Sequence, residues 1–102
     1  MTSAEAGSFV IAADHPALDG HFPGFPVVPG VVLLDEAFDV IGLGGPVHLE
    51  SVRFLAPVLP GQVVDVFSTR GGGVRVGFVC RVEGADVVVG EVGLASQSVG
   101  SV

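Results

Sequence analysis

Two side chains fourteen residues apart are the strongest candidates for acid–base chemistry in this sequence. His21 lies among prolines and glycines, and imidazole has an ordinary pKa that suits proton abstraction near neutrality. Asp35 lies in an otherwise apolar stretch, where a poorly solvated carboxyl would stay protonated, as a general acid requires. Between them, Gly30 and Val31 begin a predicted helix, whose free N–H groups suit a carbonyl oxygen that gains negative charge. These are the groups needed to remove a proton beside a thioester and expel a β-hydroxyl.

Each candidate also has an ordinary structural explanation. A histidine in a Gly/Pro loop can simply be exposed, and Asp35, Glu36 and Asp39 could form the polar stripe of an amphipathic helix. Glu36 is the weaker candidate acid, because it projects about 100° around the helix from its neighbour. His15 and His48 have no assigned chemistry. With no cysteine cluster and no histidine pair at metal-ligand spacing, we expect no metal site.

The surrounding sequence predicts one strand, one helix and then four strands. Ser8–Ala13 reads as a short strand, and the Pro- and Gly-rich segment Asp14–Pro29 is expected to be a rigid, shaped loop. From Gly30 to about Ile41 apolar residues surround most of the circumference, which predicts a buried helix that the following glycines end. The later predicted strands are Val47–Leu55, Gln62–Thr69, Val74–Val82 and Asp86–Ala95; the segment Pro57–Gly61 turns the chain after the first of them, and glycine-containing turns separate the other three.

This order of elements predicts an α+β fold in a single domain, residues 1–102, with an antiparallel sheet around the helix and a frayed tail after residue 95. Hydrophobic residues make up 49% of the chain and the mean hydropathy is +0.73, which is high for so small a domain. Together with an open sheet edge, this excess predicts edge-to-edge dimerisation. No apolar run approaches the ~18 residues of a membrane span, and the N-terminus lacks a signal-peptide pattern, so we expect a cytoplasmic protein without membrane contact.

The charge balance excludes some partners. Eleven acidic residues face four arginines and no lysine, which gives a formal net charge of −7. Phosphate contacts supply most nucleic-acid affinity and need a basic patch, so we expect neither a nucleic-acid partner nor an anionic membrane surface. The single cysteine, Cys80, cannot form an internal disulfide and is expected to be a small buried residue.

Two motifs resemble those of a known enzyme family. The first, GHFPGxPVxPGV, covers residues 20–31 and is followed by the acid Asp35; the second, VRFxxPVLPG, covers residues 52–61. Together they resemble the signature of bacterial 3-hydroxyacyl-[acyl-carrier-protein] dehydratases of the FabA/FabZ type, over about Asp14 to Leu94. The pattern HPALxGH at residues 15–21, with aspartate as the acid, is most similar to the short ApeI-like branch associated with aryl-polyene and related pathways.

The resemblance implies a hot-dog fold, in which an antiparallel sheet wraps around one long central helix and two copies join edge to edge as a double hot-dog dimer. It implies dehydration of a (3R)-3-hydroxyacyl thioester to the trans-2-enoyl thioester, without metal or cofactor. In that reaction His21 would take the C2 proton and Asp35 would protonate the leaving hydroxyl. The two residues would come from different protomers, so that the site exists only in the dimer.

The same resemblance assigns substrate-binding positions. The backbone amides of Gly30 and Val31 would hold the thioester carbonyl, and the carbonyl of Val27 would orient the histidine. Phe22 and Pro23 would belong to the loop that lines the acyl tunnel. The implied partner is an acyl carrier protein.

This chain departs from the pattern of the family in two ways, which leave alternatives open for its carrier and its function. The family often has glutamine four residues after the acid, where this chain has Asp39. Carrier proteins are acidic, so they are repelled by a chain whose net charge is −7. Three explanations remain: the four arginines cluster near the tunnel mouth, the substrate is a coenzyme A thioester, or a separate partner recruits the carrier protein. The alternatives in function are a hot-dog acyl thioesterase and a catalytically silent, acyl-binding dehydratase-like subunit.

Overall fold

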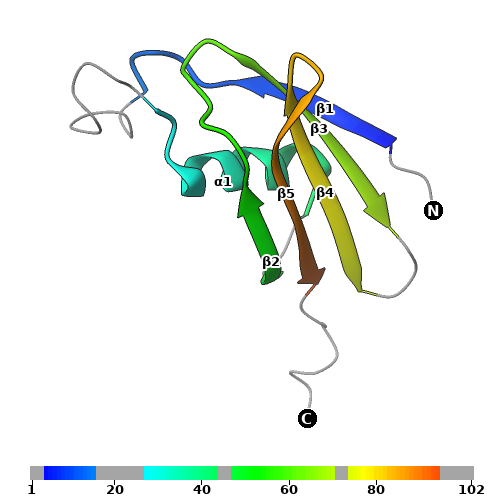
Figure 1. The fold of residues 1–102 in the computed structure, drawn as a ribbon. Coiled ribbons are helices and arrows are strands. Elements are labelled where there is room, and N and C mark those ends of the chain that lie inside the picture. Colours follow the sequence, from blue (N-terminus) through cyan, green and yellow to red (C-terminus); the bar gives the residue numbers. More distant parts are fainter. Residues whose placement is uncertain (1–3, 16–26, 44–46, 71–73, 95–102) are drawn as a thin grey trace.

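The computed structural model describes residues 4–15, 27–43, 47–70 and 74–94. The elements in this part of the chain are β1 (Ala4–Val10), α1 (Gly30–Ile41), β2 (Val47–Phe54), β3 (Val63–Arg70), β4 (Arg75–Val82) and β5 (Ala85–Leu94). The five strands form one antiparallel sheet in the order β1-β3-β4-β5-β2, and α1 lies against one of its faces (Figure 1). The predicted α+β class is confirmed, and so are both ends of the helix. The double hot-dog dimer stays a prediction.

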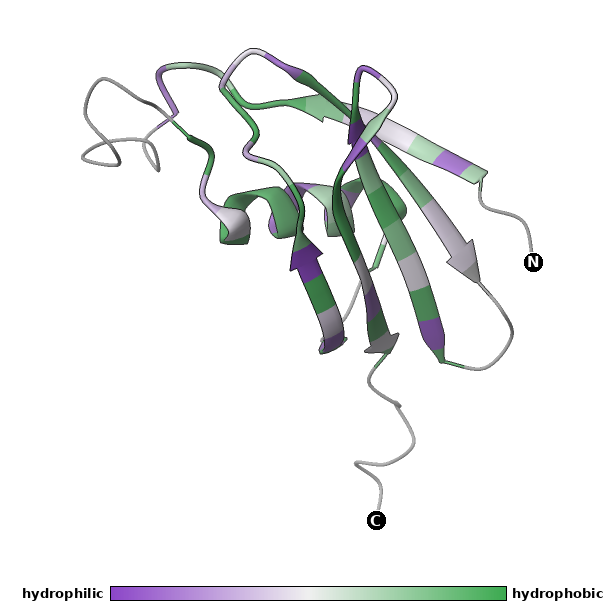
Figure 2. Ribbon diagram, in the orientation of Figure 1, coloured by the Kyte–Doolittle hydropathy of each residue, from purple (hydrophilic) through white to green (hydrophobic). Residues whose placement is uncertain are grey.

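The core follows the period of two that is expected of strands. On β4, Val76, Phe78, Cys80 and Val82 are buried and alternate with more exposed residues. Figure 2 shows that hydrophobic residues predominate along this strand. The ring of Phe78 meets that of Phe38 on α1 edge to face, with 5.4 Å between the centroids. This contact joins the helix to the middle of the sheet. The prediction that Cys80 is buried is confirmed.

The first strand lies earlier than the sequence predicted. The prediction was Ser8–Ala13, whereas β1 is Ala4–Val10 and pairs with β3 from Ala4, opposite Ser68, to Val10, opposite Val63. The residues AEAGS lack apolar alternation, so their place in the sheet comes from the pairing with β3 rather than from a local pattern. A Cβ at Gly7 would lie 2.9 Å from a methyl carbon of Val40, so β1 and α1 pack closely there.

The composition of the helix suggested that it is buried on all sides, but the structure shows that it is not. Only Leu33 and Ala37 of α1 are buried, while Val31 is 66% exposed and Asp35 and Asp39 are exposed as well. The three exposed residues follow one another at four-residue spacing and therefore share one face of the helix. The prediction of a buried helix is wrong for a single chain, because one sheet can cover only one side of it.

The C-terminal end of α1 is closed by a glycine. Gly42 has a left-handed backbone, its N–H donates to the carbonyl of Asp39, and the N–H of Leu43 donates to the carbonyl of Phe38. This is a Schellman motif, which favours glycine at that position. Most of the predicted loop Asp14–Pro29, the glycine turn at residues 71–73 and the tail after residue 95 lie outside the described residues. No helix in the described ranges is long and apolar enough to cross a membrane.

Candidate functional site

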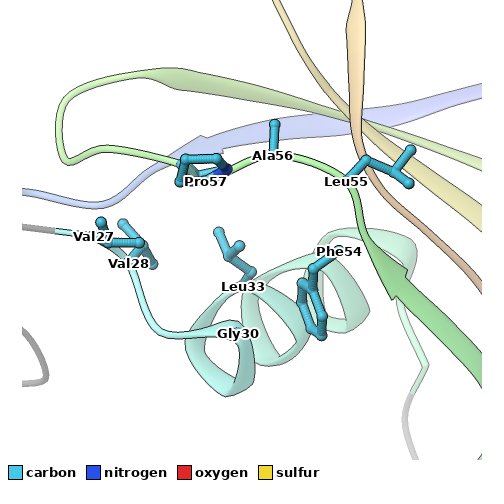
Figure 3. Close-up of a pocket in the computed structure, with 9 residues that line it drawn as sticks. Val27, Val28, Gly30, Leu33, Phe54, Leu55, Ala56 and Pro57 are labelled. Carbon is cyan, nitrogen blue, oxygen red and sulfur yellow. The ribbon is translucent and has the colours of Figure 1, made fainter.

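An apolar pocket lies at the beginning of α1. It has a volume of about 400 Å³ and is lined by Val27, Val28, Gly30 and Leu33 on the helix side and by residues 54–58 on the other. Figure 3 shows the side chain of Leu33 rising from the helix toward the segment of Ala56 and Pro57, with Phe54 at one end. None of these lining side chains is polar, so the pocket is suited to a hydrocarbon group.

Backbone hydrogen bonds hold the two walls of the pocket in place. The N–H of Val28 donates to the carbonyl of Val58 at 2.8 Å, which ties the segment before the helix to the opposite wall. The N–H of Leu55 donates to the carbonyl of Val87 at 2.8 Å, which extends the attachment of the second wall to β5. Val28 and Val58 are also buried in the core. The pocket is therefore built on fixed backbone on both sides.

The first turn of α1 presents free backbone donors at this pocket. Pro29 is the N-cap and offers no side-chain cap, and its carbonyl accepts the N–H groups of Val32 and Leu33. The N–H groups of Gly30 and Val31 have no hydrogen-bond partner among the described residues. Unpaired amides at the positive end of a helix dipole favour an oxygen that carries negative charge. Since Gly30 also lines the pocket, an apolar group inside it can have its polar end at these donors.

The structure brings some of the predicted site residues together and separates others. Val27 and Gly30 line the pocket, and the amide of Val31 belongs to the same helix end. Asp35 does not line the pocket: it is exposed on the helix face that carries the Val31 side chain. The poorly solvated carboxyl expected from the sequence is therefore not found within a single chain. His21, Phe22 and Pro23 fall on residues 16–26, outside the described ranges.

The described arginines do not gather into a free basic patch. Arg75 donates to Glu91 at 3.1 Å and lies 3.7 Å from Glu50, and Arg81 donates to Asp86 at 2.7 Å. These ion pairs are solvent-exposed and contribute little stability. They nevertheless place acidic partners beside two of the four arginines of the chain. Arg53 is exposed and has no ion-pair partner within the ranges that the structure describes.

Sequence reasoning missed one side of the pocket. Leu33 could have been found as the apolar residue one turn after Gly30 on the predicted helix. Phe54 and the residues that follow it are more than twenty positions away, so no local pattern joins them to the helix. The only signal was the second motif at residues 52–61, which covers this segment but had not been linked to a binding role.

Comparison with known sequences gives a consistent family. A family model described as ApeI dehydratase matches residues 2–90. A 3-hydroxyacyl-[acyl-carrier-protein] dehydratase FabZ of Mannheimia succiniciproducens is 34% identical over 70 residues, covering 56% of this chain and 47% of that protein. The FabZ of Rhizobium rhizogenes is 30% identical over 99 residues, covering 81% of this chain and 63% of that protein. The chain thus spans about half to two-thirds of the length of these relatives.

Comparison with solved structures supports the hot-dog fold. A chain of the dehydratase heterocomplex ApeI:P from Xenorhabdus doucetiae superposes with a TM-score of 0.72 at 18% identity, covering 94% of this chain and all of that one. An uncharacterised protein of Erwinia carotovora superposes with a TM-score of 0.69 at 21% identity, covering 95% of this chain and 98% of that one. At these identities the likeness concerns the fold.

Proposed function

Since the chain belongs to the ApeI-like dehydratase family, we propose that it removes water from a (3R)-3-hydroxyacyl thioester to give the trans-2-enoyl thioester. The observation that carries the proposal is the apolar pocket beside two free amide donors, those of Gly30 and Val31. The pocket would take the hydrocarbon chain, and the amides would hold the thioester carbonyl. Negative charge grows on that oxygen when the neighbouring carbon loses its proton, so the donors lower the barrier to that step.

The proton transfers in this proposal balance between two side chains. The imidazole of His21 takes the proton from C2, and the electron pair left on C2 forms the double bond to C3. The C3–O bond breaks, and the protonated carboxyl of Asp35 gives its proton to the departing hydroxide, which leaves as water. The protonated imidazole and the carboxylate then exchange a proton to restore the starting state.

The exposed position of Asp35 supports a site shared between two copies. Asp35 and the 66%-exposed Val31 lie on one helix face, and β2 is an edge strand of the sheet. A second copy that paired with β2 and covered this face would bury the valine and bring its own histidine loop to the carboxyl. We therefore propose a dimer whose sites each combine His21 of one protomer with Asp35 of the other. The alternative is a mixed assembly, the kind of complex in which the Xenorhabdus relative was solved.

The thioester carrier is the next part of the proposal. An acyl carrier protein is the carrier that the names of the FabZ relatives indicate, and we propose it as the partner. The net charge of −7 and the pairing of Arg75 and Arg81 oppose a purely electrostatic encounter with an acidic carrier. A coenzyme A thioester is the alternative, and the two substrates can be compared in one assay.

The test is hydration of a crotonyl thioester, the reverse reaction, followed by loss of the enoyl absorbance. The wild type is expected to hydrate it without releasing free thiol, and thiol release would point to a thioesterase instead. His21→Ala and Asp35→Asn should each be inactive, whereas Glu36→Gln, next to the acid on the helix, should retain activity. Mixing the two inactive variants should restore about a quarter of wild-type activity, since half of randomly exchanged dimers carry one intact site of two.

Three outcomes would overturn parts of this proposal. Acyl-thioester binding without turnover on any chain length would favour the silent subunit. Loss of activity in Glu36→Gln but not in Asp35→Asn would move the acid to the neighbouring residue. A dimer whose mixed variants stay inactive would refute the shared site.

A further inference from the structure

The aromatic ring of Phe54 closes one end of the pocket directly over the start of α1. Phe54 is the last residue of β2, and a Cβ built on Gly30 would lie 2.7 Å from its Cζ and 3.0 Å from its Cε1. Figure 3 shows this ring pointing from the strand toward the first turn of the helix. Real Cβ atoms do not approach other atoms within 3.0 Å, so residue 30 has to be glycine while the ring stays where it is.

The core does not account for the position of this ring. Phe54 is 52% exposed and does not belong to the buried cluster or to the apolar residues packed against it. This exposure is that of a single chain, and β2 is also the edge at which a second copy is proposed to pair. The backbone beside it is fixed by the bond from the Leu55 N–H to Val87. The ring is therefore held against the helix end by a rigid strand, while one side of it faces the space of the pocket.

We propose that Phe54 is a specificity-determining residue, which selects acyl groups that are slim next to the thioester, namely chains without a branch at C2. This inference rests on the proposed function, in which the amides of Gly30 and Val31 hold the thioester carbonyl oxygen. Two bonds separate that oxygen from C2, so a substituent on C2 lies close to whatever packs on Gly30. The atom that packs there is the tip of the Phe54 ring. A methyl branch at C2 meets the ring, whereas an unbranched chain passes beside it into the pocket.

The experiment compares an unbranched with a C2-methylated substrate in matched variants. Hydration of crotonyl-CoA and of 2-methylcrotonyl-CoA is measured as kcat/KM for the wild type, Phe54→Ala, Phe54→Leu and the control Val63→Ala. Val63 is exposed to nearly the same degree, 51%, and does not line the pocket. In Phe54→Ala the preference for the unbranched substrate should fall about tenfold, which is the usual effect of one methyl group in an apolar pocket. The preference of Phe54→Leu for the unbranched substrate should lie between those of the wild type and Phe54→Ala, and the control Val63→Ala should keep the wild-type preference.

A binding measurement separates this inference from the dehydratase proposal. Butyryl-CoA and 2-methylbutyryl-CoA have no double bond to hydrate, so their affinities are measured by calorimetry whether or not the protein is active. If hydration fails but Phe54→Ala loses the binding preference for butyryl-CoA, the dehydratase proposal fails and the role of Phe54 stands. If the wild type hydrates crotonyl-CoA and the Phe54 variants keep its preference unchanged, the role of Phe54 is refuted. If the wild type neither turns over nor binds these acyl groups, whether they are carried by coenzyme A or by an acyl carrier protein, both are refuted.

The clash itself can be tested without any ligand. Gly30→Ala alone should destabilise the folded chain, because its methyl group meets the ring. Adding Phe54→Ala should remove most of that loss, so that the two substitutions are strongly non-additive in chemical denaturation. Additive effects would show that the ring is not held at the helix end, because it then gives way to the methyl group at no cost, and the proposed selection at C2 would have no basis.

Discussion

The thiol of Cys80 is the one side-chain group of this chain that is expected to ionise between pH 9 and pH 11. The sequence contains no lysine and no tyrosine, arginine stays charged throughout this range, and an α-amino group titrates near pH 8. Cys80 lies on β4 between Val66 of β3 and Val88 of β5, and all three residues are at most 1% exposed. Burial disfavours the thiolate and raises the pKa of Cys80 from its ordinary value of 9.0 to about 11.

The raised pKa makes stability fall as the solution becomes more basic. Well below pH 9 the thiol is protonated in both states and the full stability is present. Between pH 9 and pH 11 the unfolded chain loses this proton while the folded chain keeps it, so the free energy of unfolding decreases as pH rises. A shift from 9.0 to about 11 corresponds to a total loss of roughly 2–3 kcal/mol, at no more than about 1.4 kcal/mol per pH unit.

The assay is urea denaturation of the wild type and Cys80→Ala at pH values from 8 to 11. The alanine variant should start lower, because a buried sulfur is lost, but its free energy of unfolding should stay nearly constant over this range. The wild type should approach the variant as the pH rises. Parallel curves for the two proteins would refute the reasoning, since the decline would then come from another group, and a flat wild-type curve would show that the thiol is not shielded from water.

Three further substitutions test the sheet and one of its turns. Gly90→Ala should cost about 2–3 kcal/mol, because its Cβ would lie 2.6 Å from the carbonyl oxygen of Ser51 and 2.8 Å from the ring of Phe78. Gly77→Ala, whose Cβ would meet nothing closer than 3.9 Å, should keep a free energy of unfolding within about 1 kcal/mol of the wild type. Equal losses of this free energy in the two alanine variants, measured by chemical denaturation, would contradict the distances at the two glycines. In the turn after β4, both Glu83 (φ 52°) and Gly84 (φ 83°) have left-handed backbones, as a type I′ turn requires. Glu83→Asn should therefore raise the stability by about 0.5 kcal/mol and increase the Tm, and an unchanged Tm would show that the glutamate carries no strain there.

Elements with a strong local pattern were predicted well. The helix begins after Pro29 and ends at Gly42, and both boundaries follow from residues that favour or forbid helical backbone. Both ends of each of the four later strands lie within one residue of the prediction, because apolar runs are bounded by segments that contain glycine or proline. The first strand was misplaced, since the segment from Ala4 to Ser8 lacks such alternation and is held by its partner strand.

The candidate site, like the fold, was predicted only in the parts that a local pattern determines. The sequence by itself determined the residue types of the proposed acid and base, and the helix start whose free amides adjoin the pocket. Only the tertiary structure decided that Phe54 rests on Gly30 and that Asp35 faces outward beside Val31. The physical reason is that backbone preferences and side-chain periodicity act over a few residues and can be read along the chain. The wall of a pocket and the exposed side of a helix depend on which distant segments the folded sheet brings into contact.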